Sequence, residues 1–239
     1  MEYVQRTYRN LVQGNFLTSF RVCEEQTDLF IQADQDLTGP ANSFVHLYRV
    51  SLKNYIFSHP QFLTSLNPLP DDPLAPPIVK AMLQASRLAG VGPMAAVAGA
   101  MAEFVGKDLL KHSFNVIIEN GGDLYLKATR ALNIAVFAGK SPLSYRIALK
   151  IHPEDTPLGI CTSSATVGHS LSLGIADAVC VKAKSAVLAD AAATAIGNIV
   201  QNQGDIKKAL EASKKIQGVL GVLIIVEKSM GVIGNMELN

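Results

Sequence analysis

The segment from residue 157 to residue 198 constrains the fold and the function of this chain more than any other part. It begins with a loop of small and hydroxyl-bearing residues, Cys161 to Ser170, which contains one histidine, His169. An apolar strand is predicted from Ala178 to Lys184, and an alanine-rich helix follows it. A loop rich in Thr, Ser and Gly offers many hydrogen-bonding groups and allows a close approach to the backbone. We therefore expect this loop to contact a ligand.

Two oxygen-bearing side chains, Asp190 and Thr194, lie four residues apart on the predicted helix. Residues at this spacing share one face of a helix. Hard oxygen ligands placed in this way suit a magnesium ion, either alone or bound to a phosphate group. The alternative is an alanine-rich packing helix that binds nothing, because magnesium sites have no strict sequence signature.

The composition limits the class of protein. Hydrophobic residues make up 49% of the 239 residues and charged residues 17%, so we expect a sizeable core and little disorder. The formal net charge of +1 provides no electrostatic basis for binding nucleic acid. The apolar runs 94–101 and 219–226 are too short to cross a bilayer, and the first residues lack a signal-peptide pattern. We therefore expect neither a nucleic-acid nor a membrane partner.

The three cysteines, Cys23, Cys161 and Cys180, have no paired spacing. Without a CxxC motif we expect neither a zinc site nor a disulfide framework, and a reducing cytoplasm fits best. Cys161 directly precedes Thr162 and lies eight residues before His169. A thiol in that position could carry a persulfide if nearby groups lowered its pKa, and the alternative is a buried structural cysteine.

Helices and strands are predicted in groups rather than in strict alternation, which favours an α+β fold with mixed or antiparallel sheets. Helices are predicted over 37–58, 78–89, 94–112 and 204–218. Strands are predicted over 20–22, 29–33, 114–119, 124–127, 133–138, 144–151, 158–161, 178–184, 219–226 and 229–239. The proline-rich stretch 67–77 is either a linker after an N-terminal hairpin-plus-helix unit or a crossing loop, and we predict one domain over 1–239.

Several charges and glycines in these elements allow two interpretations. Glu103 is interpreted as a charge on a helix face, and Arg49 as a solvated side chain. Glycine inside the third helix, at Gly99 for example, costs about 1 kcal/mol against alanine, which close packing or a ligand would offset. The turn 120–123 (Asn-Gly-Gly-Asp) predicts a hairpin, and its bare backbone is equally suited to a ligand.

Four motifs, taken in order, resemble the ApbE-type flavin transferase superfamily. They are VGPMAAVAGAMAE, ENGGDLYLK, AGKSPLS and TSSATVGHSLS, and the match extends over nearly the whole chain. The similarity is greatest to a short, uncharacterised branch of ApbE-like proteins. It implies a T-fold-related α+β fold and a Mg2+-dependent site for FAD. Transferases of this superfamily split the FAD diphosphate and attach FMN to a threonine of an acceptor protein.

The resemblance also implies roles for individual residues. It matches the metal-binding pair to Asp190 and Thr194. It matches the groups beside the nucleotide to Gly121, Gly122, Asp123, Thr162, Ser163, Ser164 and His169. It implies that the catalytic groups are among His169, Thr162 and Cys161. His169 is an acid/base or a hydrogen-bond donor to phosphate, because the pKa of histidine suits either role.

The chain also departs from the superfamily pattern. Ser170-Leu-Ser-Leu stands where the transferases have Asp-Pro-x-Thr-Gly, and Ala98-Gly99 stands where they have Lys-Gly. No counterpart of their flavin-holding N-terminal segment is found. Three functions therefore stay open: a Mg2+-dependent enzyme acting on FAD or another nucleotide, a sulfur-metabolism factor for homocysteine formation that uses Cys161, and a non-catalytic binding protein. A homodimer is expected from the apolar sheets.

Overall fold

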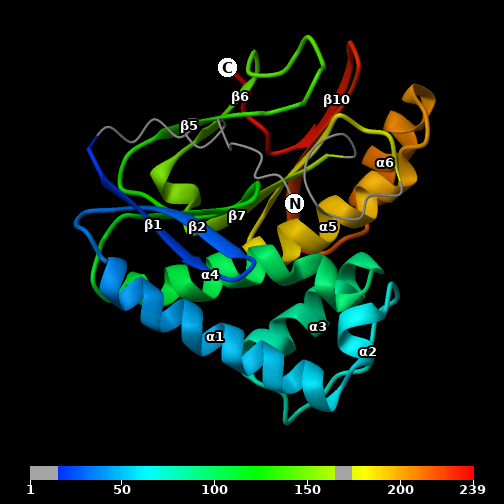
Figure 1. The fold of residues 1–239 in the computed structure, drawn as a ribbon. Coiled ribbons are helices and arrows are strands. Elements are labelled where there is room, and N and C mark those ends of the chain that lie inside the picture. The colour runs from blue at the N-terminus through cyan, green and yellow to red at the C-terminus, as the bar shows by residue number, and fades with distance from the viewer. Residues whose placement is uncertain (1–15, 165–173) are drawn as a thin grey trace.

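The computed structural model describes residues 16–164 and 174–239, and its centre is an antiparallel eight-stranded sheet (Figure 1). The strand order is β1-β2-β3-β4-β7-β8-β9-β10. The strands are β1 (Thr18–Glu24), β2 (Thr27–Ala33), β3 (Val116–Asn120), β4 (Asp123–Lys127), β7 (Leu158–Ser163), β8 (Ala178–Ala183), β9 (Val219–Val226) and β10 (Ser229–Gly234). The α+β prediction is confirmed, as are the N-terminal hairpin and the buried strand at 219–226.

The helices cover one face of the sheet, and a small hairpin covers the other (Figure 1). The helices are α1 (Thr38–Ser58), α2 (Gln61–Thr64), α3 (Pro77–Ala89), α4 (Val97–Leu109), α5 (Ala186–Ile199) and α6 (Ile206–Ser213). The 3-10 turns are η2 (Pro93–Ala96), η3 (Pro153–Asp155) and η4 (Gln203–Asp205). The hairpin consists of β5 (Leu132–Ala135) and β6 (Ala148–Ile151).

Several predicted boundaries were wrong. The predicted helix 94–112 is a 3-10 turn, η2, followed by the shorter α4, and the predicted helix 204–218 ends at Ser213. The predicted strand 144–151 begins only at residue 148, because Tyr145 has a positive φ of 60° and its N–H donates to the carbonyl of Val136 in a turn. β7 extends to Ser163, so Thr162 and Ser163 belong to the sheet and not to a loop.

Two glycines, which have no side chain, allow α5 to pack very closely on the sheet and on α4. A Cβ atom at Gly159 of β7 would lie 2.2 Å from Cα of Ala186, and one at Gly99 of α4 would lie 2.2 Å from the carbonyl oxygen of Ala186. Both distances are far shorter than any van der Waals contact. The first turn of α5 therefore rests directly on two glycines, which confirms close packing as the reason for Gly99.

Two charged side chains are less exposed than the sequence suggested. Glu103 is only 5% exposed, and one of its oxygens, Oε2, accepts hydrogen bonds from Ser185 Oγ at 2.7 Å and the Ala186 N–H at 2.6 Å. Its other oxygen pairs with Lys107. The Arg49 side chain is 11% exposed and pairs with Glu25. Glu103 was interpreted as a charge on a helix face, and that face is buried against the start of α5. The interpretation of Arg49 as a solvated side chain was wrong, because it finds partners in the β1–β2 hairpin.

The proline-rich stretch 67–77 contacts the helices beside it. Leu69 packs against the core, and the Tyr55 hydroxyl donates to Asp72 Oδ2 at 3.0 Å. Asp71 forms an ion pair with Arg87 of α3. These contacts hold the stretch against α1 and α3, as a crossing loop would be held.

Among residues 16–164 and 174–239, no single helix is long and apolar enough to cross a bilayer. The segments 77–89 and 93–109 satisfy the length and composition test only together, as a pair bent by 104°. Many of their apolar side chains are buried in the core, as is usual for core helices.

Candidate metal and nucleotide site

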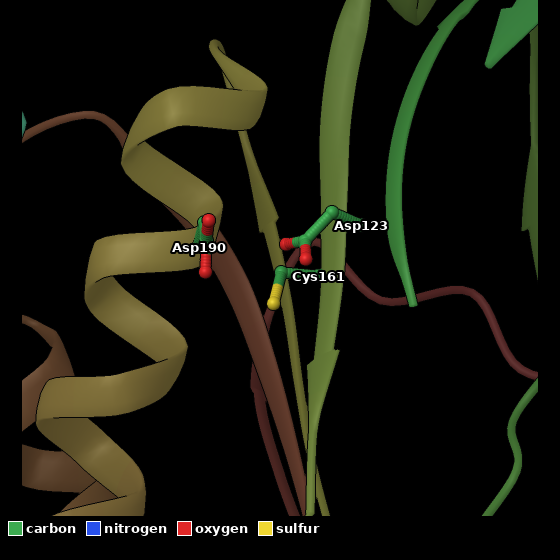
Figure 2. A group of neighbouring side chains, drawn as sticks. All are labelled: Asp123, Cys161 and Asp190. Atoms are coloured by element: carbon green, nitrogen blue, oxygen red, sulfur yellow. The ribbon is translucent and has the colours of Figure 1, made fainter. Parts of the chain in front are cut away.

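Three side chains from three different elements meet on the helical face of the sheet. They are Asp123 of β4, Cys161 of β7 and Asp190 of α5, and one potential ligand atom of each lies within 4.8 Å of the other two. Figure 2 shows the Asp123 carboxylate and the Cys161 thiol directed toward the helix that carries Asp190. We call these three residues the acid–thiol cluster.

The register of the sheet brings Asp123 and Cys161 together. Gly121 and Gly122 both have positive φ, 68° and 113°, which closes the two-residue turn between β3 and β4 and pairs Asn120 with Asp123. Asp123 is then directly opposite Cys161 in the next strand. Opposite residues point to the same face of a sheet with their Cβ atoms about 5 Å apart, so the carboxyl group and the thiol are neighbours.

Asp190 is placed by its own hydrogen bonds and by the anchoring of α5. Its Oδ2 accepts the Gly99 N–H at 2.9 Å. At the start of α5, the Ser185 side chain caps the Leu188 N–H and also donates to Glu103. Glu103 therefore anchors the helix that carries Asp190, although sequence patterns alone gave no signal for this contact.

Burial makes charge costly in this cluster. Burial raises the pKa of Asp123 to about 7, and the nearby charge of Glu119 adds to this, while a hydrogen bond with Cys161 opposes it. Burial, followed by the charge of Asp123, holds the pKa of Asp190 well above its usual value, against the opposing hydrogen bonds from Gly99 and Ala98. Burial and then the two carboxylates likewise raise the pKa of the Cys161 thiol. A cation would stabilise the ionised form of all three groups.

The free-energy cost of burying polar groups is clearest at Asp123. The residue is 7% exposed, and its Oδ1 is buried without a hydrogen-bond partner among residues 16–164 and 174–239. A buried polar atom without a partner costs about 1–3 kcal/mol. Since few native groups are left in this state, an atom such as Asp123 Oδ1 requires an explanation, and a bound cation provides one.

The remaining predicted site residues are only partly brought together. Thr194 lies one turn after Asp190 on α5, and the Thr162 N–H donates to the Gly122 carbonyl at 3.1 Å, so β7 adjoins the glycine turn. Side chains alternate along β7, so the Thr162 hydroxyl points to the opposite face from Cys161, where it hydrogen-bonds to Cys180. Ser163 returns to the face of Cys161, and Ser164 follows it at the strand end.

His169 was predicted as the acid/base, and it lies outside the described residues. The proposed role of His169 therefore rests on the sequence motif. The Thr162 side chain, also predicted as catalytic, is not directed at the acid–thiol cluster. Its backbone, which contacts Gly122, is the part of Thr162 that adjoins the site.

A cavity of about 670 Å3 is lined mainly by residues of α1, of the β1–β2 turn and of the first part of α4. Its wall includes Ala98 and Asn120, and the Asn120 side chain donates to the Ala98 carbonyl at 3.0 Å. The lining is mostly apolar, with the charged side chains of Glu25, Arg49 and Lys53. The cavity is within the size range of small-molecule sites. Its wall includes Ala98, and the N–H of the next residue, Gly99, donates to Asp190.

The burial of Cys161 predicts its reactivity in the metal-free protein. A buried thiol with a raised pKa is a poor nucleophile, because the thiolate is the reactive form. With iodoacetamide we expect the exposed Cys23 to be modified first and Cys161 and Cys180 to react far more slowly. Mass spectrometry of timed digests measures the three rates. Modification of Cys161 as fast as that of free glutathione would contradict this prediction and favour the persulfide hypothesis.

Comparison with known proteins identifies the family. The family model described as AbpE bacteria matches residues 9–238. A UPF0280 protein of Methanococcus aeolicus is 42% identical over 217 residues, which are 88% of each chain, and one of Methanosarcina acetivorans is 35% identical over 198 residues, 82% of this chain and 78% of the other.

Solved structures show the same fold at low sequence identity. The apo flavinyl transferase ApbE of Pseudomonas stutzeri has a TM-score of 0.56 at 13% identity, covering 91% of this chain and 94% of that one. The ApbE protein of Thermotoga maritima has a TM-score of 0.52 at 12% identity, covering 90% and 96%. The solved structures show that the fold is that of ApbE proteins, and the family model over residues 9–238 shows that the chain belongs to the AbpE bacteria family, alongside relatives that are UPF0280 proteins.

Proposed function

We propose that this protein binds a Mg2+-complexed nucleotide diphosphate of the FAD class and acts on the diphosphate, by FMN transfer or by hydrolysis. One observation carries the proposal: the Asp190 carboxylate lies next to Asp123, which ends the Gly121–Gly122 turn, and next to Cys161 near the end of β7. The fold shared with flavinyl transferases supports it.

The oxygen groups at the site suit the metal. Asp190 and Thr194 present a carboxylate and a hydroxyl from successive turns of α5. Hard oxygen groups of this kind are the ligands that Mg2+ takes in proteins. When bound, the ion supplies positive charge that stabilises negative charge developing on the phosphate oxygens.

The other residues position the ligand. The glycine turn has no side chains, so phosphate oxygens can approach its backbone. Ser163 and Ser164 offer hydroxyl donors at the end of β7, and the Gly99 N–H keeps the Asp190 carboxylate oriented. The apolar cavity would take the ring system, while Arg49 and Lys53 on its wall are ion-paired with Glu25. A proton to the leaving phosphate would come from His169, as the motif implies.

Isothermal titration calorimetry with FAD and with ADP, each with and without Mg2+, tests this proposal. We expect Mg2+-dependent binding that Asp190→Ala weakens by at least about 30-fold, since losing a charged metal ligand costs about 2 kcal/mol or more. Glu211→Ala is the matched control, because it removes an exposed acid from α6, far along the chain from the site residues. We expect it to bind like the wild type.

Two outcomes would contradict the proposal. One is a folded wild-type protein that binds neither FAD nor ADP at any Mg2+ concentration. The other is Asp190→Ala binding as tightly as the wild type, which would instead favour a ligand site that does not involve the metal pair.

A further inference from the structure

The donor atoms of the acid–thiol cluster do not match magnesium alone. Mg2+ takes oxygen ligands in a nearly ideal octahedron and has little affinity for sulfur. Cys161 places a sulfur atom between two carboxylates, on the side of Asp190 that faces the sheet (Figure 2). A thiolate together with carboxylates is a ligand set for Zn2+, Fe2+ and similar ions. The cluster therefore differs in chemistry from the Asp190–Thr194 oxygen pair.

The geometry of the cluster is close to that of a bound ion. Zinc binds thiolate sulfur at about 2.3 Å and carboxylate oxygen at about 2.0–2.2 Å, so two ligand atoms of one tetrahedral ion are roughly 3.5 Å apart. The three ligand atoms here lie within 4.8 Å of one another. Side-chain rotations that move these atoms by about 1 Å would therefore bring them onto a common ion.

The surroundings hold the ligands in place before any ion binds. Asp123 and Cys161 are opposite each other in a central strand pair, and the Gly99 N–H restrains Asp190. Asp123 is an independent sign of a ligand, because its side chain is more than nine-tenths buried and its Oδ1 has no hydrogen-bond partner in the part of the chain that the structure describes. Three protein ligands from three elements are also the usual number in zinc sites that keep a position open.

We infer that Asp123, Cys161 and Asp190 form a site for a thiophilic divalent ion such as Zn2+ or Fe2+, next to the proposed Mg2+ position. Cys161 binds as the thiolate, and the proton of its thiol is released to solvent. The fourth position of a tetrahedral ion stays open for water or for a phosphate oxygen of the nucleotide. This inference deepens the proposed function, because the two sites share Asp190, but metal binding at the cluster needs no nucleotide.

Cobalt absorption tests the inference directly, since Co2+ replaces Zn2+ and a cobalt–thiolate bond produces a near-ultraviolet charge-transfer band. The full chain is stripped with a chelator and titrated with Co2+ without oxygen, and Zn2+ is then added as a competitor. We expect the wild type to show the band and Zn2+ to abolish it. Cys161→Ser should lose the band and bind Zn2+ at least tenfold more weakly. Asp123→Asn, which keeps the shape of the side chain, should also weaken Zn2+ binding at least tenfold.

Two control variants make the result specific. Cys180→Ser changes another buried cysteine, on β8, that faces the opposite side of the sheet, so it should keep the band. Thr194→Ala should keep the band while weakening Mg2+-dependent ADP binding. Circular dichroism confirms that each variant is folded, and if Cys161→Ser is not, Asp123→Asn decides the question alone.

The outcomes separate this inference from the proposed function. A wild type without the band, or a band that survives in Cys161→Ser, overturns the thiolate site, even if Mg2+-dependent ADP binding is intact. With Asp123→Asn as the deciding variant, unchanged Zn2+ affinity overturns it equally. A cysteine-dependent band in a protein that binds no nucleotide would uphold the metal site and overturn the proposed function instead.

Discussion

Replacing Gly159 by alanine should be among the most destabilising single changes in this protein. A Cβ atom there would lie 2.2 Å from Cα of Ala186 and 2.3 Å from its nitrogen, and both are backbone atoms that no side-chain rotation can move. The first turn of α5 would have to lift from β7, opening the core beneath it. We expect a loss of about 3–5 kcal/mol in the free energy of unfolding, measured by urea denaturation followed by circular dichroism.

Gly39→Ala is the matched control for this substitution. Gly39 is also a glycine in a regular element, α1, but a Cβ atom there would meet nothing within 4 Å. Alanine is the better helix former, so this variant should be unchanged or more stable by up to about 1 kcal/mol. Equal stability of Gly159→Ala and Gly39→Ala would show that α5 is not packed as described.

Glu103→Ala should have the second large effect. Its Oε2 is the shared acceptor for the Ser185 hydroxyl and for the N–H groups of Ala186 and Val187 at the start of α5. Without it, buried donors lose their acceptor, and the N-terminus of the helix loses a neighbouring negative charge. We expect a loss of about 3 kcal/mol in the free energy of unfolding, in the same urea experiment.

Two variants separate the causes of this loss. Glu103→Gln keeps one oxygen acceptor and should cost less, about 1–2 kcal/mol. Lys107→Ala removes the half-exposed partner of Glu103 and should cost at most about 0.5 kcal/mol, as is usual for exposed ion pairs on a helix. If Lys107→Ala proved as costly as Glu103→Ala, the surface ion pair and not the anchoring of α5 would be the stabilising contact.

The stability of α5 also has a functional meaning. The helix carries both Asp190 and Thr194, and its first turn is held by Glu103 and by contact with Gly99 and Gly159. A shift of that turn would move Asp190 away from Asp123 and Cys161. Under the proposed function, folded variants that loosen this anchoring should therefore also bind Mg2+ and the nucleotide less tightly.

Local patterns were sufficient to predict most of the elements. The Asn-Gly-Gly-Asp turn, the amphipathic helices near 38–58 and 77–89 and the strand at 219–226 follow from periodicity, proline and glycine, which act within a few residues. The α+β class and the ApbE-like family were likewise evident from element order and from motifs. Boundaries were less certain, as at 144–147, where the positive φ of Tyr145 has no local signature.

Only the tertiary structure decided which of these residues meet. The sequence presented Asp123, Cys161 and Asp190 in separate motifs, and the paired spacing that announces many zinc sites is absent, because each group comes from a different element. Their meeting depends on the register of β4 against β7 and on two glycines that let α5 approach. In the same way, periodicity could not distinguish a solvated Glu103 from one that anchors another helix. Long-range pairing is selected by the whole core at once, so no local stretch of sequence can specify it.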